Sequence, residues 1–169
     1  MTNENIQQKL IEKFGDNVSN FEETYGMLSF ETPANNNIAV MRFLYDEEDL
    51  RFRFLTDVTA VHYPNDKGRE LAVVYHLHNL ADNIRLRFKC FLDIEKPDIE
   101  SATALYESAN WQEREAYDFF GVNFVNHPNL KRIMNAEEMD YFPLRKEYPL
   151  EDQSRTDKDD AMFGRGGSF

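Results

Sequence analysis

Two segments near the middle of the chain alternate apolar and polar residues, the pattern typical of a half-buried β-strand. They cover residues 71–77 and 84–92, and in the second the apolar side chains alternate with Arg85, Arg87 and Lys89. The short polar link between the two segments suits a hairpin turn. One face of the resulting sheet is apolar and the other basic, which predicts a sheet that is covered on one side only.

Helical spacing of apolar residues marks two segments of the first half of the chain. The first segment follows a capping position, Thr2 or Asn3, and ends at Gly15. The second begins at another possible cap, Asn37, after a polar stretch that contains a proline and an asparagine cluster. Two strand-like runs complete this half of the pattern, residues 25–31 and 52–63.

The chain changes character after one more helical segment. Ser101 can cap a helix that continues, with a break near Asn110, to Gly121. Residues 141–169 show no sustained period, and they combine prolines and mixed charge with scattered apolar side chains. Such a stretch predicts an extended tail rather than part of a core. We therefore expect a folded domain over residues 1–140 followed by this tail.

Composition narrows the classes of function. The chain has 169 residues and a net charge of −12, which disfavours sequence-independent binding to nucleic acid and direct docking on an anionic membrane. It contains no run of about 18 apolar residues that would suggest a membrane span. The first residues resemble neither a signal nor a transit peptide, and a single Cys excludes an internal disulfide. These features fit a cytoplasmic protein that works beside other proteins.

Residues 111–120 interleave charged and aromatic side chains in a way that ordinary surface helices do not. On a helix, most of these charges fall on one side, whereas Glu113 falls among the aromatic residues on the other. Glu113 is therefore predicted to be buried, and a buried carboxylate needs a cation or several N–H donors. We expect Arg132 to be that cation, and Arg114 to pair with Asp118 one turn further along the helix.

Two interpretations of this segment predict different functions. Glu113, Glu115 and His127 could perform acid–base chemistry in a stand-alone hydrolase. Alternatively, an ion-pair network fixes the helix and a partner surface, which is the more common origin of such carboxylates. Because Pro128 follows His127 and biases it towards an extended backbone, this histidine is expected to form a rigid corner rather than a catalytic base.

Other candidates for chemistry are weaker. His76 and His78 share one face of a predicted strand, but zinc usually needs three or four protein ligands, so a half-exposed sheet face is the favoured interpretation. Cys90 alternates with apolar residues and is expected in the core. The sequence contains no phosphate-binding loop, no dinucleotide-binding glycine motif and no nucleophile elbow. One Cys does not suffice for an iron–sulfur cluster either, so we expect no cofactor or metal on this chain.

Residues 113–134, EREAYDFFGVNFVNHPNLKRIM, closely resemble the signature of the 30-kDa subunit of respiratory complex I, the C subunit of the bacterial NADH–quinone oxidoreductase. A second block, PLRKEYPL, resembles the tail motif of the same family. The resemblance covers roughly residues 50–150, and it departs from the family at His62 and Glu147, where Asp is common. The matching positions are Glu113, Arg114, Glu115, Tyr117, Asp118, Phe119, Phe120, Gly121, His127, Pro128, Leu130, Arg132, Pro143, Leu144, Arg145, Lys146, Tyr148 and Pro149.

The resemblance implies an α+β fold, a two-layer domain with a mixed, largely antiparallel sheet covered by helices, plus an extended C-terminal tail. It implies that the tail lies along the 49-kDa-type chain (the D subunit), which helps to form the quinone site, with the B and I subunits nearby. The motif positions are then expected at this partner interface. The chain itself is expected to bind no cofactor, whereas the whole complex uses FMN, iron–sulfur clusters, NADH and quinone.

The same resemblance places the chain in the peripheral arm, on the cytoplasmic side of the bacterial inner membrane, with membrane association only through the complex. An alternative is the homologous subunit of a related membrane-bound hydrogenase or of another donor-specific quinone dehydrogenase. Neighbouring genes separate these two, because NADH-binding flavin subunits favour complex I and nickel-binding subunits favour a hydrogenase. The stand-alone hydrolase is the least favoured interpretation.

Overall fold

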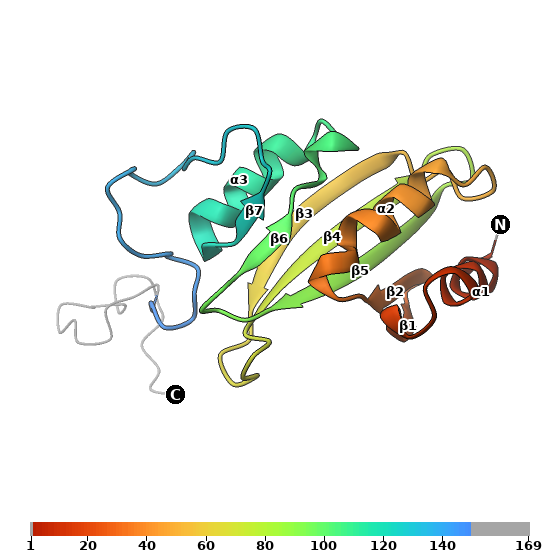
Figure 1. Cartoon of the computed structure of the whole chain (residues 1–169), viewed down its shortest axis with the longest axis horizontal. Coiled ribbons are helices and arrows are strands. Elements are labelled where there is room, and N and C mark those ends of the chain that lie inside the picture. Colours follow the sequence, from red (N-terminus) through yellow and green to blue (C-terminus); the bar gives the residue numbers. More distant parts are fainter. Residues whose placement is uncertain (1, 150–169) are drawn as a thin grey trace, which may run out of the picture.

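A mixed sheet of five strands forms the frame of the protein in this computed structural model, which describes residues 2–149 (Figure 1). The strand order is β1-β2-β5-β4-β3; β2 and β5 run parallel, and the other neighbours are antiparallel. Two short parallel strands, β6 and β7, form a second sheet. The strands are β1 (Ser19–Thr24), β2 (Met27–Glu31), β3 (Phe54–His62), β4 (Leu71–Asn79), β5 (Ile84–Leu92), β6 (Asp98–Glu100) and β7 (Asn123–Val125).

Helices pack on one face of the five-stranded sheet and complete a two-layer α+β fold, as predicted (Figure 1). Ile6 of α1 and Met41 of α2 are fully buried in the same core as Tyr75 and Phe88 of the sheet. Fully burying a large apolar side chain stabilises the fold by about 1.5–3 kcal/mol. The helices are α1 (Asn3–Phe14), α2 (Asn37–Asp46) and α3 (Ala109–Phe120), with 3-10 turns η1 (Gly15–Asn17), η2 (Ala34–Asn36) and η3 (Ala102–Ala104).

Alternation along β5 agrees with the sequence pattern. Leu86 and Phe88 are fully buried, whereas Arg85 is exposed and Arg87 is half-buried. The opposite face of β5 is therefore basic, and the predicted hairpin between β4 and β5 is present with full antiparallel register. In β4, by contrast, residues 71–75 are all buried, so its first half is covered on both faces.

Several element boundaries differ from the sequence-based expectation. The polar stretch after the first helix contains the edge strand β1 (Ser19–Thr24), which its exposed residues concealed. Asn37 is the first residue of α2 rather than its cap, and its side-chain amide donates to the carbonyl of Glu100 at 2.7 Å. Ser101 caps only the turn η3, so the break in the third helical segment comes before Asn110.

Candidate functional site around helix α3

Helix α3 lies beside the edge strand β3 and supplies hydrogen bonds to it. The Ser108 hydroxyl donates to the carbonyl of Leu55 at 3.3 Å, and the Gln112 amide donates to the carbonyl of Thr56 at 3.2 Å. An uncovered strand edge would leave such groups free to pair with another chain. The helix ends at Gly121, whose left-handed φ of 78° is readily adopted by glycine. The edge contact and this stop fix the direction in which α3 presents its carboxylates.

Glu113 is fully buried, as predicted, but its predicted partner is wrong. Its Oε2 accepts a hydrogen bond from the Ser101 hydroxyl and its Oε1 accepts one from the Ala102 N–H, both at 2.6 Å. These donors belong to the start of the turn η3, where backbone N–H groups have no partner within the turn. Burial raises the pKa of Glu113 to about 7, although the two hydrogen bonds act in the opposite direction.

The predicted partner, Arg132, instead binds Asp118, which is also fully buried. The Arg132 Nη1 atom lies 2.8 Å from Asp118 Oδ1. Asp118 Oδ2 accepts from the backbone N–H groups of Ile133, Met134 and Asn135 at 3.0, 2.8 and 3.0 Å. Burial alone would raise the pKa of Asp118, but these N–H groups and Arg132 outweigh it and hold that pKa well below its usual range.

Arg132 connects this carboxylate to the start of the tail. Its side chain is only 6% exposed, and its Nη2 donates to the carbonyls of Met139 and Tyr141 at 2.9 and 3.0 Å. Its guanidinium also lies 5.0 Å from the ring centroid of Phe142. We call Asp118, Arg132 and the three backbone N–H groups of residues 133–135 the Asp118 clasp. The clasp fixes residues 132–142 against the C-terminal half of α3.

The expected Arg114–Asp118 pair is also wrong. Arg114 donates through Nε and Nη2 to the carbonyls of Lys131 and Arg132 at 3.1 and 3.3 Å, and its guanidinium stacks 4.8 Å from the centroid of Trp111. Asp118 already has Arg132 and three backbone N–H donors, so it does not need Arg114 as a second cation. Glu115 is exposed, as expected for the charged side of the helix. Asp118 was expected on that same side, and its full burial corrects this part of the prediction.

Phe142 was not singled out by sequence analysis, although it anchors the tail. A Cβ atom at Gly121 would lie 2.5 Å from the Phe142 ring, so only glycine leaves room for this contact. Two cations contact the ring: the guanidinium groups of Arg145 and Arg132 lie 4.7 and 5.0 Å from its centroid. The edge of Tyr117 completes the contact at a centroid distance of 6.2 Å. The sequence signal for this contact is Gly121, a glycine directly after a helix that ends in aromatic residues.

Residues 144 and 145 bond to the end of α3. The Leu144 N–H donates to the carbonyl of Phe119 at 3.2 Å, and Arg145 Nε donates to that of Phe120 at 2.8 Å. The last carbonyls of a helix have no partner inside it, so the tail satisfies groups that would otherwise need water. The tail motif PLRKEYPL therefore lies next to the end of α3, although Pro143 comes 22 positions after Gly121 in the sequence.

A residue that departs from the family pattern also holds the tail. His62 Nδ1 accepts a hydrogen bond from the Lys146 N–H at 3.0 Å. Burial lowers the pKa of His62, which keeps Nδ1 free to accept. Beyond this point Tyr148 and Tyr141 lie with ring centroids 5.0 Å apart, and both remain partly exposed. Of the two tail-motif prolines, Pro143 is half-buried and Pro149 is exposed. Residues 150–169 of the predicted tail lie outside the described residues.

His127 forms a corner. The Nε2 atom of its ring donates to the carbonyl of Asn110 at 3.0 Å, and its Nδ1 accepts from the Asn129 N–H at 3.0 Å. Both ring nitrogens are therefore occupied by backbone groups, which fits the structural role that the following Pro128 indicated. Glu113, Glu115 and His127 each have a different environment. Five surface cavities of the described residues are lined by residues between 2 and 91, and none of these three side chains lines them.

The histidine pair on β4 is not joined by further ligands. His78 Nε2 donates to the Asn83 side chain at 3.1 Å, and His76 Nδ1 lies 3.8 Å from a carboxylate oxygen of Asp57. Within residues 2–149, no group of three or more His, Cys, Asp or Glu side chains is placed to hold a metal. Cys90 is fully buried in the core, as predicted. Over the same residues, no helix is long and apolar enough to cross a membrane.

Comparison with known proteins agrees with the motifs assembled here. Residues 30–154 match the family described as "Respiratory-chain NADH dehydrogenase, 30 Kd subunit". The C subunit of the NADH-quinone oxidoreductase of Citrifermentans bemidjiense is 44% identical over 147 residues, which cover 87% of this chain and 89% of that protein.

Two solved structures share the fold. The fragment titled "Nqo5 of the trypsin-resistant fragment (1-134)" superposes with a TM-score of 0.63 at 29% identity, covering 74% of this chain and 98% of that one. A chain of the membrane-bound sulfane sulfur reductase, an archaeal respiratory membrane complex, gives a TM-score of 0.72 at 25% identity and covers 87% and 85% of the two chains. The resemblance seen in the sequence is thus confirmed over most of its length, and the chain belongs to the family of the 30-kDa peripheral subunit of respiratory complex I.

Proposed function

We propose that this chain is a non-redox subunit of the peripheral arm of a proton-translocating NADH–quinone oxidoreductase, and that it supports assembly with the 49-kDa-type subunit of the quinone site. Electron transfer from NADH to quinone belongs to the whole complex, whose FMN and iron–sulfur clusters are held by other chains. The B and I subunits lie nearby in this proposal. The complex places the chain at the cytoplasmic side of the bacterial inner membrane.

One observation carries the proposal: the Asp118 clasp and the contacts of Phe142 fix a segment that exposes large apolar side chains. Met134 is 70% exposed, and Leu144 and Tyr148 are 44% and 40% exposed. Trp111, 65% exposed on the adjoining helix, extends the same region. Exposed aromatic and apolar residues on a rigid backbone are typical of protein interfaces, because little ordering is required on binding.

A structural role for the two buried carboxylates supports the same proposal. Asp118 is surrounded by donors from its own chain, and Glu113 is engaged by Ser101 and Ala102. Neither carboxylate is among the residues that line the five cavities named above, whereas a hydrolase needs its catalytic carboxylates beside a cavity for the substrate. The stand-alone hydrolase therefore gains no support from the geometry around Glu113, Glu115 and His127.

Purification of the tagged full-length chain from native membranes tests the proposal. We expect the 49-kDa-type subunit and the NADH-binding flavin subunit to be recovered with it. Deletion of the residues after Asp140 removes Phe142 and the tail contacts, and should reduce recovery of the 49-kDa-type subunit. A complex recovered in unchanged yield with the truncated chain would contradict the assembly role.

A matched pair of single substitutions makes the test finer. Leu144→Ala and Ile11→Ala remove the same kind of aliphatic side chain at 44% and 45% exposure, one on the tail and one on α1. We expect Leu144→Ala to lower the yield of the complex and Ile11→Ala to leave it unchanged. Equal yields for the two variants would count against a docking role for the tail.

The structural similarity to a chain of the sulfane sulfur reductase complex favours one second candidate. In that candidate, the chain serves as the corresponding subunit of a respiratory complex with a different electron donor. The same purification separates the two functions. Recovery of an NADH-binding flavin subunit supports the first, and its absence beside other membrane subunits supports the second.

A further inference from the structure

The polar face of the sheet carries a group of nitrogen-bearing side chains that the proposed docking of the tail does not use. Arg85 and Arg87 of β5 lie directly across from His78 and His76 of β4 in the antiparallel register. We call these four residues the β4–β5 basic patch. Side chains opposite each other on two strands are about 4.5–5.5 Å apart at Cβ, so the four form a compact array.

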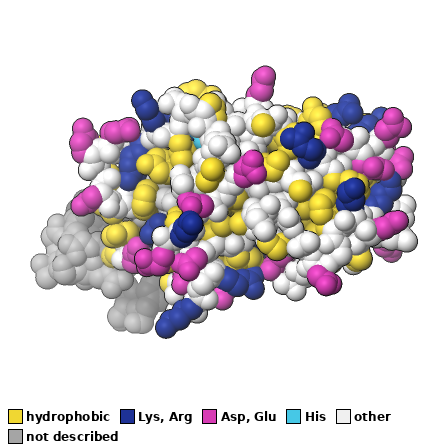
Figure 2. Space-filling model, in the orientation of Figure 1, with side chains coloured by type: hydrophobic (Ala, Val, Ile, Leu, Met, Phe, Trp, Pro, Cys, Tyr) yellow, Lys and Arg dark blue, Asp and Glu magenta, His cyan; other side chains and the backbone are white. Residues whose placement is uncertain are grey.

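Charges within the patch are poorly compensated by the described residues. Arg87 donates through Nε to the Ser29 hydroxyl at 3.1 Å, and no carboxylate of residues 2–149 lies within 4.0 Å of either arginine. The strand register gives two acidic neighbours: Asp57, half-exposed and 3.8 Å from His76, and Glu22 of β1, which lies across from Ser29. The whole chain has a net charge of −12, and on the face that carries α2 acidic and basic side chains are interspersed (Figure 2). A basic array is thus a local exception on an acidic protein.

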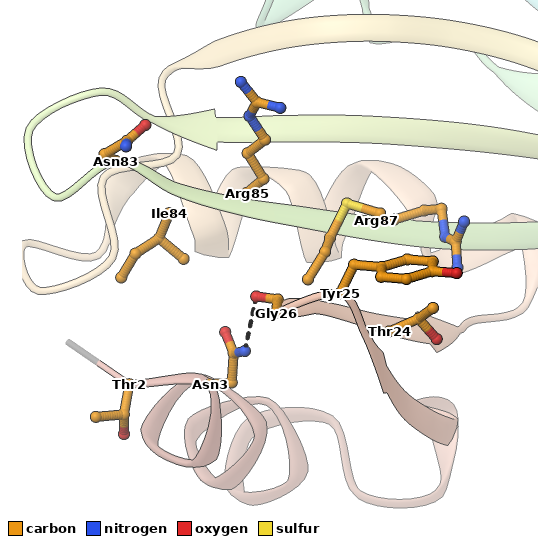
Figure 3. A pocket seen from close by; sticks show the side chains of 10 residues that line it. Thr2, Asn3, Thr24, Tyr25, Gly26, Asn83, Ile84, Arg85 and Arg87 are labelled. Carbon is orange, nitrogen blue, oxygen red and sulfur yellow. Dashed lines mark hydrogen bonds between the residues drawn. The ribbon is translucent and has the colours of Figure 1, made fainter.

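A groove continues the patch towards the N-terminus. It has a volume of about 650 Å³ and lies between the first residues of α1, the turn joining β1 to β2, and β5 (Figure 3). Asn3 holds that turn by donating to the carbonyl of Gly26 at 3.2 Å. The turn presents Tyr25, whose side chain is fully exposed, and Arg87 extends towards this tyrosine (Figure 3). Tyrosine and arginine together are frequent energetic centres of protein interfaces.

We propose that the β4–β5 basic patch and this groove bind an acidic, extended segment of a neighbouring protein subunit. Arg85 and Arg87 are two residues apart on a strand, a spacing of about 6.7 Å. Carboxylates at alternate positions of an extended segment have the same spacing, and a guanidinium can bind a carboxylate through two parallel hydrogen bonds. Tyr25 and Ile84 of the groove offer apolar contacts to the rest of such a segment.

A protein segment fits this surface better than a polyanion does. Nucleic acid and anionic lipid both present many phosphates, and the overall charge of −12 repels them. A short acidic segment needs only the two arginines. The inference rests on the proposed function for the source of the segment, namely another subunit of the same complex, but it concerns a face separate from the tail.

Zero-length crosslinking in the native complex tests the contact. Carbodiimide joins a lysine amine to a carboxylate in direct contact, so the charge-preserving R85K/R87K variant converts the patch into a reporter. We expect mass spectrometry to find a link from these positions to Asp or Glu of a neighbouring subunit. The R42K variant, at an exposed arginine of α2, is the matched control and should give no such link. No link from R85K/R87K, or a link only to the acidic residues 151–160 of the same chain, would overturn the proposal.

Charge reversal gives the second measurement. Salt washes of the complex measure how tightly each variant is held. The affinity of R85E/R87E for the complex should be about tenfold or more weaker than that of wild type, because like charges then face each other. R42E should behave as wild type. Equal retention of R85E/R87E and R42E would contradict the proposal. So would binding of the full wild-type chain to RNA or anionic vesicles that is lost in R85E/R87E.

If the wild-type chain recovers no other subunit, the proposed function fails as well. If it recovers them and R85E/R87E changes nothing, only this inference fails. Should R85E/R87E not fold, R85K/R87K crosslinking decides.

Discussion

Glu113 and Asp118 lie on the same helix and are both fully buried, yet their surroundings favour opposite charge states. Glu113 has two donors, and burial raises its pKa to about 7. Asp118 has a guanidinium and three backbone N–H groups, which hold its pKa well below its usual range. The comparison teaches that the number of donors, rather than burial alone, decides whether a buried carboxylate keeps its charge.

These two carboxylates also connect different parts of the molecule. Glu113 joins α3 to the turn η3 and so belongs to the folded domain. Asp118 joins α3 to residues 132–142, which precede the proposed docking segment. The Glu113 site stabilises the fold, and the Asp118 clasp stabilises the surface that the fold presents.

Asp118→Asn should have the largest effect on stability. The amide cannot replace a charged acceptor for three N–H groups, and it leaves the buried Arg132 without a counter-ion. Breaking one side of a buried ion pair costs about 3–5 kcal/mol. Chemical denaturation measures this loss, with Glu115→Gln on the exposed side of the same helix expected to change stability by less than about 0.5 kcal/mol. A loss for Asp118→Asn no larger than that of the control would contradict the clasp.

Glu113 should make stability depend on pH in the direction opposite to the usual carboxylate. Because its pKa is raised from 4.5 to about 7, the folded state binds the proton more tightly. The contribution of Glu113 to stability is therefore fully present below pH 4.5 and decreases as pH rises to about 7, by about 3 kcal/mol at most. Glu113→Gln should remove this decrease, since the amide remains neutral. Identical pH slopes for wild type and Glu113→Gln, measured by denaturation, would show that Glu113 is not the source.

Gly121→Ala separates the tail from the helix end. The new Cβ would collide with Phe142, and the overpacking is expected to cost about 1–3 kcal/mol. Gly68→Ala is the matched control, because its φ of 77° is almost the same as the 78° of Gly121 while nothing lies within 4 Å of its Cβ position. The difference between the two free energies of unfolding isolates the Phe142 contact. Equal values would mean that Phe142 does not occupy this position.

Trp111→Ala should have the smallest effect on the isolated chain. The side chain is 65% exposed and contacts Arg114 rather than either carboxylate, so a change below about 0.5 kcal/mol is expected. The same substitution should lower the yield of the complex if this region docks on a partner. A large loss of stability without any loss of yield would place Trp111 in the fold and not in the interface.

Sequence patterns predicted the parts of the structure that depend on neighbouring residues along the chain. The alternation along β5 and the burial of Glu113 on the apolar side of α3 are of this kind. Strand β1 was missed because Phe21, which stacks on Phe30, is the one apolar residue of an otherwise exposed edge strand, so there is no apolar alternation to detect.

The partners of the carboxylates could not be predicted in the same way. Helical geometry places Glu113 on a face, but it does not show that Ser101 and Ala102 lie opposite that face. Asp118 is bound by the backbone of residues 133–135, and backbone donors leave no mark in the residue types. The charged residues were therefore correctly singled out, whereas their pairing required the fold.

A carboxyl-resolved NMR titration of the full-length chain tests the central claim most directly. We expect the Glu113 carboxyl to titrate near pH 7 and Asp118 to remain ionised through the acidic range in which the chain stays folded. Ordinary midpoints for both carboxyls, or an Asp118 midpoint above that of Glu113, would contradict the assignment of one to the fold and the other to the clasp.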